Sequence, residues 1–385
     1  MSVTDQLDRL AAMEPAPYPV VSLYLNTQPG STGRDQFQTF VRKEFAARGR
    51  TYPANSPERE SLEKDVERIS QYLATELEPS ANGLAIFACS AGELFEAIQM
   101  TAPIDQHSLY IGDLPHLYPL ARVESLHPSF AAVLADTNSA RILVVATGEV
   151  VNDQEIKGVK TRQTSQGGWS QARYQRHIEN FHLQHAKEVV EALDRIVQRE
   201  NIPEVLLAGD ESIIPLLKEQ MPKHLAERVV DQLRYDRDAS LDELLKTSLD
   251  AMRKVHEQTE REKVEAAIGG YRSGGLGVLG PEETLDAMVK GQVEELLMTA
   301  RLEELQGLSG PKAGGTATAS EAEQAEPIVE TMLAGEAAQA PAEAVRMADE
   351  LVSKAAQTAA RITFIQDPEL LAPYGGVAAL LRFRI

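Results

Sequence analysis

One stretch of the sequence combines residue types that could bind an anionic partner. Residues 156–178 read IKGVKTRQTSQGGWSQARYQRHI and contain five basic residues, one His and no Asp or Glu. The basic residues of this stretch are Lys157, Lys160, Arg162, Arg173 and Arg176, and the His is His177. The whole chain has a formal net charge of -20, so the stretch reverses the local sign. Because Lys and Arg gain from counterion release along phosphates, the pattern favours a nucleic acid partner.

A glycine pair lies at the centre of this basic stretch. Gly167 and Gly168 permit backbone angles that are closed to other residues, and the only Trp of the chain, Trp169, follows them. An aromatic ring can stack on a base. The alternative is a solvated surface loop that is basic by chance. Acidic residues fill 58 of the 385 positions, so a window of 23 residues without any of them is uncommon by chance. Because the rest of the chain is acidic, contact with nucleic acid is expected to be local.

Length and composition limit the possible classes of protein. A chain of 385 residues suggests about two or three domains, and 43% apolar with 25% charged residues is typical of a soluble globular protein. No apolar run could span a bilayer, and the start MSVTDQLDRLAAMEP is not a signal peptide, so a cytoplasmic location without membrane contact is expected. The single cysteine, Cys89, excludes a disulfide framework and is expected in the core.

The first segment, residues 1–125, is predicted to be a mixed α/β domain. Val20–Thr27 has the pattern of a strand, and Ser56-Pro57 is a typical helix start before an apolar stripe. Gly83–Ser90 is predicted to be a buried strand. Nothing in this segment indicates an active site.

Residues 128–238 are predicted to form a middle domain that holds the basic stretch. Strands are expected at 131–136, 141–146 and 149–156, followed by the glycine loop and a long helix that begins near Arg173. A further buried strand is expected at 204–210. The loop is therefore expected between two rigid elements, where functional loops are often found.

Residues 240–385 are predicted to form a third domain. A long helix begins near Ser240, a second helix begins at Pro281, and a strand is expected at 293–300. Residues 275–280 match GxGxxG, but they follow a helix rather than a strand, which favours a loop over a dinucleotide site. Residues 307–344 are rich in Ala, Gly, Glu, Pro and Thr and are expected to be a disordered or loosely ordered insert. A helix at 344–356 and strands at 360–365 and at the end of the chain complete the domain.

Three motifs of the chain resemble the superfamily of archaeal and eukaryotic class-1 release factors. They are GGWSQARYQRH at the start of the long middle helix, GVLGPEETLDAMVKGQVEELLM and APYGGVAALLRFRI. The superfamily also holds Pelota-like proteins, bacterial members, ribosome-rescue hydrolases and Balon-type hibernation factors. The resemblance implies an α/β protein of three mixed domains. The middle domain would carry a protruding Gly-Gly loop before a long helix, and the last would be an αβα sandwich.

The sequence departs from the family pattern at two places. In an ungapped alignment Trp169 occupies the position of the family's catalytic glutamine, which leaves Gln171 as the best candidate and Gln166 as a weaker one. The first domain has no NIKS motif, with which the eukaryotic factor reads stop codons. The resemblance therefore implies rescue of stalled ribosomes, or occupation of idle ones, rather than stop-codon reading.

The resemblance implies ribosome-dependent hydrolysis of P-site peptidyl-tRNA, with Gly167, Gly168 and Gln171 as the catalytic residues. A glutamine amide does not titrate, but it can orient the attacking water, and the glycines let the backbone approach the ester. The residues expected to contact ribosomal RNA are Lys157, Lys160, Arg162, Trp169, Ser170, Arg173, Arg176 and His177. The alternatives are a non-hydrolytic hibernation factor that occupies the A site and an RNA-binding protein that acts away from the ribosome.

Other site chemistries have weaker support. His177, His182 and His185 could be considered a metal cluster, but no acidic or cysteine partner has a convincing spacing. Ser170 and His177 lack an orienting acid and a nucleophile elbow. Neither a metal nor another cofactor is predicted. By the family's pattern the third domain would dock a translational GTPase, such as elongation factor Tu, or the ribosomal stalk base.

Overall fold

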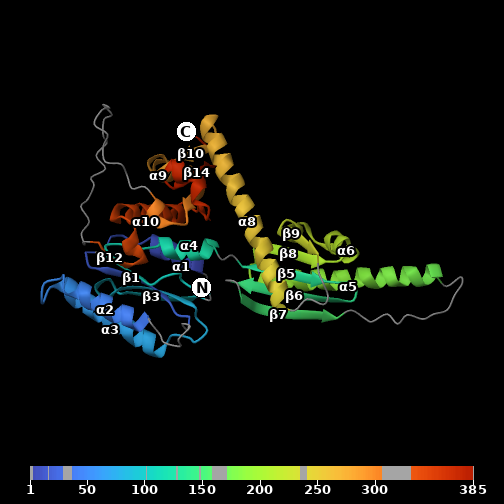
Figure 1. Ribbon diagram of the computed structural model, residues 1–385, viewed down its shortest axis with the longest axis horizontal. Helices are drawn as coiled ribbons and strands as arrows, with labels where there is room; N and C mark the ends of the chain where they lie inside the picture. Colours follow the sequence, from blue (N-terminus) through green and yellow to red (C-terminus); the bar gives the residue numbers. More distant parts are fainter. Residues whose placement is uncertain are drawn as a thin grey trace. The chain divides into compact units, whose positions relative to one another are not determined.

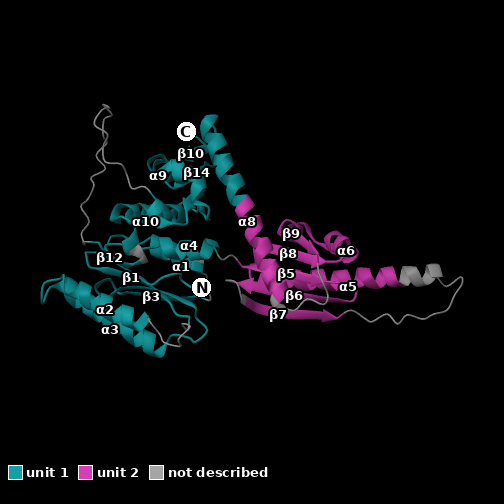
Figure 2. Cartoon of the chain, viewed as in Figure 1, with its two compact units in different colours: residues 1–126, 259–385 teal, residues 127–258 magenta. Residues whose placement is uncertain are grey.

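The computed structural model describes residues 3–15, 17–28, 37–100, 102–126, 129–146, 149–157, 171–234, 241–305 and 331–384. The chain divides into two compact units (Figure 2). The first unit joins residues 1–126 to residues 259–385, and the second consists of residues 127–258. Within the described residues, no helix has the length and apolar character needed to cross a bilayer.

The first unit contains an antiparallel sheet of five strands in the order β12-β4-β1-β2-β3 (Figure 1). Its strands are β1 (Val20–Asn26), β2 (Gly83–Cys89), β3 (Leu94–Met100), β4 (Ser108–Gly112) and β12 (Met332–Gly335). The two central strands β1 and β2 are almost wholly buried, because helices cover both faces of the sheet. The strands predicted at 20–27 and 83–90 are confirmed, and Cys89 is buried as expected.

Strand β12 corrects the prediction of a loosely ordered segment at 307–344. Residues 306–330 lie outside the described part, but Met332–Gly335 pair with β4, and Ala334 is buried in the core. The average composition of the whole segment does not reveal a strand of four residues. This strand is stabilised by backbone hydrogen bonds to β4, which is distant in the sequence. The prediction is therefore wrong for the last part of the segment.

Two groups of helices cover this sheet. Helices α2 (Phe37–Gly49) and α3 (Pro57–Thr75) pack on one face, with Phe37, Phe45, Leu62 and Ile69 in the core. The other face is covered by α1 (Val3–Ala11), α4 (Tyr118–Leu126) and α10 (Ala342–Gln357). Helix α3 begins as predicted, since the Ser56 side chain accepts a hydrogen bond from the Arg59 N–H at 3.2 Å.

The first unit also contains a second sheet, in the order β10-β14-β11-β13. Its strands are β10 (Gly277–Leu279), β11 (Val293–Thr299), β13 (Arg361–Ile365) and β14 (Val377–Leu381). Helix α10 and α9 (Pro281–Val289) pack on one face, in the same core as α1 and α4. The C-terminal part of α8 (Leu241–Arg272) packs on the other face through Val264 and Ala267. The layer of α1, α4 and α10 thus lies between the two sheets, which joins both ends of the chain in one unit (Figure 1).

The second unit is built on a mixed sheet in the order β7-β6-β5-β8-β9. Its strands are β5 (Phe130–Ala135), β6 (Ser139–Ala146), β7 (Glu149–Lys157), β8 (Glu204–Gly209) and β9 (Val229–Arg234). Helices α5 (Gln171–Arg199), α6 (Ile213–Gln220) and α7 (Lys223–Ala226) pack on one face, and the first part of α8 packs on the other. The predicted strands and both long helices are confirmed. The division into three domains at 125 and 240 stays a prediction.

A buried carboxyl in the first unit provides a test of pH-dependent stability. Asp65 on α3 accepts a hydrogen bond from the Ser90 hydroxyl at 2.5 Å, while its other oxygen has no hydrogen-bond partner among the described residues. Burial raises the pKa of Asp65 to about 6, against the lowering effects of Ser90 and Arg68. Because the folded pKa is raised, this group stabilises the fold at low pH and loses that contribution as the pH rises through about 6.

We expect Asp65→Asn to raise the free energy of unfolding by about 2 kcal/mol at pH 7.5, because it removes a buried charge. The gain should shrink as the pH falls through about 6 and disappear by about pH 3, where the carboxyl is neutral in both the folded and the unfolded protein. Urea denaturation between pH 3 and 8 measures this, with Glu67→Gln on the exposed side of α3 as the control. An unchanged pH profile in Asp65→Asn would contradict the prediction.

Candidate functional site

Two elements of the second unit frame the basic stretch. Among the described residues, strand β7 pairs with β6 alone and forms an edge of the sheet, and its last residue, Lys157, stands opposite Ser139. Helix α5 is fixed to the sheet by a buried apolar stripe that runs from Ala186 to Val197. None of the residues 178–184 is buried, so the first part of α5 projects beyond the core (Figure 1). The sequence between the two elements is therefore carried on rigid supports.

The predicted site residues fall into two groups. Lys160, Arg162, Gly167, Gly168, Trp169 and Ser170 lie outside the described residues, as does Gln166. Lys157 ends β7, and Gln171, Arg173, Arg176 and His177 occupy the first two turns of α5, where the backbone is described but the side chains are not. Gln171 is the first residue of α5, two residues earlier than the helix start expected near Arg173. The structure thus gives the backbone framework of the site.

The first turn of α5 favours an anion. It contains no acidic residue. The backbone N–H groups at the start of a helix have no partner within the helix, and the helix dipole adds partial positive charge there. A 29-residue helix that begins at Gln171 therefore presents N–H donors and positive potential at its N-terminal end.

The basic residue at the end of β7 is not isolated. The Lys157 ammonium lies 3.1 Å from the Glu155 carboxylate, and both side chains are exposed. Nearby, Arg141 donates two hydrogen bonds to Asp153, at 2.8 and 2.5 Å, which lower the pKa of that carboxyl. An exposed ion pair contributes little energy, about 0–1 kcal/mol, so Lys157 can exchange Glu155 for a phosphate at small cost.

The histidines of α5 do not act as a group in the described part of the structure. His185 is only 3% exposed, and neither ring nitrogen has a hydrogen-bond partner among the described residues. His182 is half-buried, and the side chain of His177 is not described. Within the described residues, no group of three His, Cys, Asp or Glu side chains could hold a metal ion. The helical spacing of His185 with Ala186 and Val189 already places it on the apolar face, so its burial is structural.

A second exposed surface lies in the first unit, where three large apolar side chains reach solvent. Tyr271 is 50%, Leu276 48% and Phe383 47% exposed. Leu276 O accepts a hydrogen bond from Leu381 N at 3.1 Å, and the Arg384 guanidinium donates to Gly275 O at 3.3 Å, which brings the end of the chain beside residues 275 and 276. We call Tyr271, Leu276, Phe383 and Arg384 the C-terminal patch. Exposed large apolar side chains are typical of protein interfaces.

One family profile matches the middle region of the chain. Residues 115–253 match the profile of bacterial archaeo-eukaryotic release factor family 10. The matched range contains the whole basic stretch, β7 and α5. No curated protein sequence matches the chain.

Several solved structures are similar to the chain at low sequence identity. An archaeal translation termination factor, aRF1, is 17% identical over 99% of this chain and 98% of that chain, with a TM-score of 0.25. Pelota from Archaeoglobus fulgidus is 16% identical over 80% and 82%, with a TM-score of 0.31. Dom34 from S. cerevisiae is 9% identical over 83% and 94%, with a TM-score of 0.44. These TM-scores are below 0.5. The family profile therefore carries the comparison: residues 115–253 are similar to the bacterial archaeo-eukaryotic release factors of family 10.

Proposed function

We propose that the protein is a ribosome-associated rescue factor that promotes hydrolysis of peptidyl-tRNA without reading a stop codon. The observation that carries the proposal is the family match over residues 115–253, which includes the basic, glycine-centred stretch. The absence of a NIKS motif argues against codon reading. The P-site peptidyl-tRNA would be the substrate, and the ribosome would supply most of the catalytic surroundings.

The chemistry assigned to the stretch is attack of water on the ester that joins the peptide to tRNA. The ester carbonyl oxygen becomes negative in the transition state, so oriented water and hydrogen-bond donors lower the barrier. Gln171 would orient the water through its amide, which both donates and accepts. Gly167 and Gly168 would let the backbone approach the ester closely. The start of α5 at Gln171 supports this proposal, because its free N–H groups favour developing negative charge.

Binding would depend on the cations around the glycine pair. Lys157, at the end of β7, and Arg173 and Arg176, on α5, flank the loop from its two ends. Lys160, Arg162 and His177 would add further contacts to ribosomal RNA phosphates, and Ser170 a hydrogen bond. Trp169 would stack on a nucleotide.

The proposed partner of the first unit is a translational GTPase, with elongation factor Tu as the candidate. The C-terminal patch supports this, because Tyr271, Leu276 and Phe383 are exposed there. The patch includes part of the LRFRI ending on which the family resemblance rests.

A second candidate function is occupation of the A site of idle ribosomes without hydrolysis. It is favoured by one observation, that Trp169 stands where an ungapped alignment places the catalytic glutamine. The two functions share the same binding surface and differ only in whether an amide reaches the ester.

Charge reversal on α5 tests the shared binding surface. We expect Arg173→Glu/Arg176→Glu to weaken sedimentation with purified ribosomes about 10- to 100-fold near physiological salt, because two phosphate contacts are lost. The matched control is Arg195→Glu/Arg199→Glu on the exposed part of the same helix, which should bind like the wild type.

Single-turnover release from ribosomes that carry labelled peptidyl-tRNA and an empty A site separates the two functions. Fast release by the wild type supports the rescue hydrolase, whereas binding without release supports the occupancy factor. Equal binding of both double variants would contradict the assignment of this surface, and absence of ribosome binding by the wild type would contradict both functions.

A further inference from the structure

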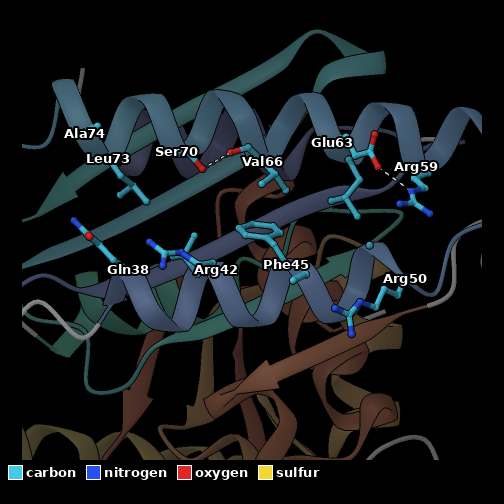
Figure 3. Close-up of a pocket in the computed structure, with 14 residues that line it drawn as sticks. Gln38, Arg42, Phe45, Arg50, Arg59, Glu63, Val66, Ser70, Leu73 and Ala74 are labelled. Atoms are coloured by element: carbon cyan, nitrogen blue, oxygen red, sulfur yellow. Dashed lines mark hydrogen bonds and ion pairs between the residues drawn. The ribbon is translucent and has the colours of Figure 1, made fainter. Parts of the chain in front are cut away.

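Helices α2 and α3 leave an open groove between them on the surface of the first unit (Figure 3). The groove has a cavity volume of about 580 Å³. Its floor is apolar and contains Val41, Phe45 and Leu62, which also belong to the core beneath the two helices. Val66 and Leu73 of α3 line the same groove and are only partly buried. Because the floor is part of the packed core, the groove is a preformed feature rather than a loose surface.

The α2 side of the groove carries unpaired positive charge. Arg42 and Arg50 line the groove, and neither forms an ion pair with any residue that the structure describes. The neighbouring arginines differ, since Arg48 pairs with Glu44 and Arg59 with Glu63 across one helical turn. In a chain of formal net charge -20, two free guanidinium groups beside an apolar floor are an unusual combination. The groove therefore favours an occupant that is both apolar and acidic.

The dimensions of the groove fit a helix. Its α2 side runs from Gln38 to Arg50, which corresponds to about 18 Å along a helix, or about three turns. Arg42 lies in α2 and Arg50 directly follows its last residue, so carboxylates about two turns apart on a bound helix would match them. An occupant helix that buries apolar residues at positions i, i+3 or i+4, and i+7 would cover the floor.

Nucleic acid fits the groove less well than an acidic helix does. The only aromatic residue in the lining is Phe45, which is 4% exposed and lies on the floor, so no ring is available to stack on a base. The α3 side carries Glu63, whose carboxylate would repel phosphates.

We propose that the groove between α2 and α3 binds an acidic amphipathic helix of a partner protein. This site is separate from the release chemistry and does not depend on it.

A designed peptide tests the chemistry of the groove on the full-length protein. The probe is a fluorescein-labelled helical peptide of about 14 residues with leucine on one face and glutamate on the flanks, compared with the same peptide carrying lysine for glutamate. We expect saturable binding of the acidic probe by fluorescence anisotropy, and a loss of at least about 10-fold in affinity in Arg42→Glu/Arg50→Glu.

The control for this charge reversal is Lys43→Glu/Lys64→Glu, which changes the net charge equally outside the groove lining, at Lys43 on α2 and Lys64 on α3. All four residues are exposed and the control removes only exposed ion pairs, so circular dichroism and thermal unfolding should stay close to the wild type. Equal affinity of the acidic and basic probes, or equal loss in both double variants, would overturn the proposal.

Crosslinking identifies the natural occupant. The photoreactive residue p-benzoylphenylalanine replaces Ala46 in the groove lining, or Glu67 on the exposed part of α3 as the control, and the full chain is irradiated in cells of its source. Mass spectrometry should find an acidic, amphipathic helical segment of another protein attached at position 46 and not at position 67. A crosslink to RNA, to the same chain or to a second copy would overturn the proposal, as would no crosslink specific to position 46.

Discussion

Gln171→Ala is expected to lower single-turnover release of peptide from ribosome-bound peptidyl-tRNA about 100- to 1,000-fold, with ribosome affinity unchanged. A loss of rate of this size is typical of enzymes in which one group that stabilises an oxyanion is removed. Affinity should be retained because a neutral amide contributes little to the phosphate contacts that dominate binding. The measurement compares the rate of release at saturating protein with the fraction of protein that sediments with ribosomes.

The choice between glutamines needs a matched set of variants. Gln166→Ala removes the amide on the other side of the glycine pair and should leave release unchanged. Gln184→Ala removes an exposed amide farther along α5, where it bonds to Glu188, and serves as the control for helix stability. If Gln166→Ala stops release while Gln171→Ala does not, the catalytic amide belongs to Gln166. If the wild type itself binds without release, the occupancy function replaces the hydrolase.

Gln171→Glu sharpens this test because it keeps the size and shape of the side chain. A carboxylate at this position can still accept a hydrogen bond from water, but it would repel the negative oxygen that develops on the ester. Release should therefore fall at least as far as in Gln171→Ala. Near wild-type release by Gln171→Glu would indicate a general base, which contradicts an orienting amide.

Local patterns in the sequence predict the elements that frame the candidate site. The strand pattern that ends near Ile156 and the apolar spacing from Ile178 to Val197 correspond to β7 and α5. The basic stretch is visible because its charge differs from that of the chain. The glutamine proposed to orient water is harder to assign, because Gln166 and Gln171 both flank the glycine pair and the spacing is compatible with either.

Elements with a weak local signal are not predicted by the sequence. Strand β12 is only four residues long, and it forms because β4, more than 200 positions earlier, offers its backbone groups. Helix α2 has a short apolar repeat of Phe37, Val41 and Phe45 among charged residues, which gives a weak periodic signal. The groove beside α2 follows from how two helices pack on one sheet, and packing of this kind cannot be derived from either helix alone.

The junction between the two ends of the first unit shows the same dependence on tertiary structure. Asp349 on α10 accepts hydrogen bonds from the backbone N–H groups of Leu117 and Tyr118, at 2.8 and 3.1 Å. These groups lie at the start of α4, so Asp349 acts as the N-terminal cap of a helix more than 220 residues away. The His116 Nδ1 atom lies 2.7 Å from the same carboxylate, and His116 is 1% exposed.

Asp349→Ala is expected to lower the free energy of unfolding of the first unit by about 3–5 kcal/mol. The change leaves two helix N–H groups without their acceptor and a buried imidazole without its partner, and each such loss costs about 1–3 kcal/mol. Urea denaturation followed by circular dichroism measures the effect. The matched control is Glu350→Ala, which removes the exposed carboxylate next in sequence and should change stability by less than about 0.5 kcal/mol.

Asp349→Asn distinguishes capping from charge. Its amide oxygen can still accept from Leu117 and Tyr118, so a loss well below that of Asp349→Ala would show that the hydrogen bonds to α4 carry most of the energy. An equal loss in both variants would show that the charged partner of His116 matters more. A loss below about 1 kcal/mol in Asp349→Ala would contradict the view that this carboxylate fastens α10 to the start of α4. In that case the apolar layer between the two sheets would hold the unit together without it.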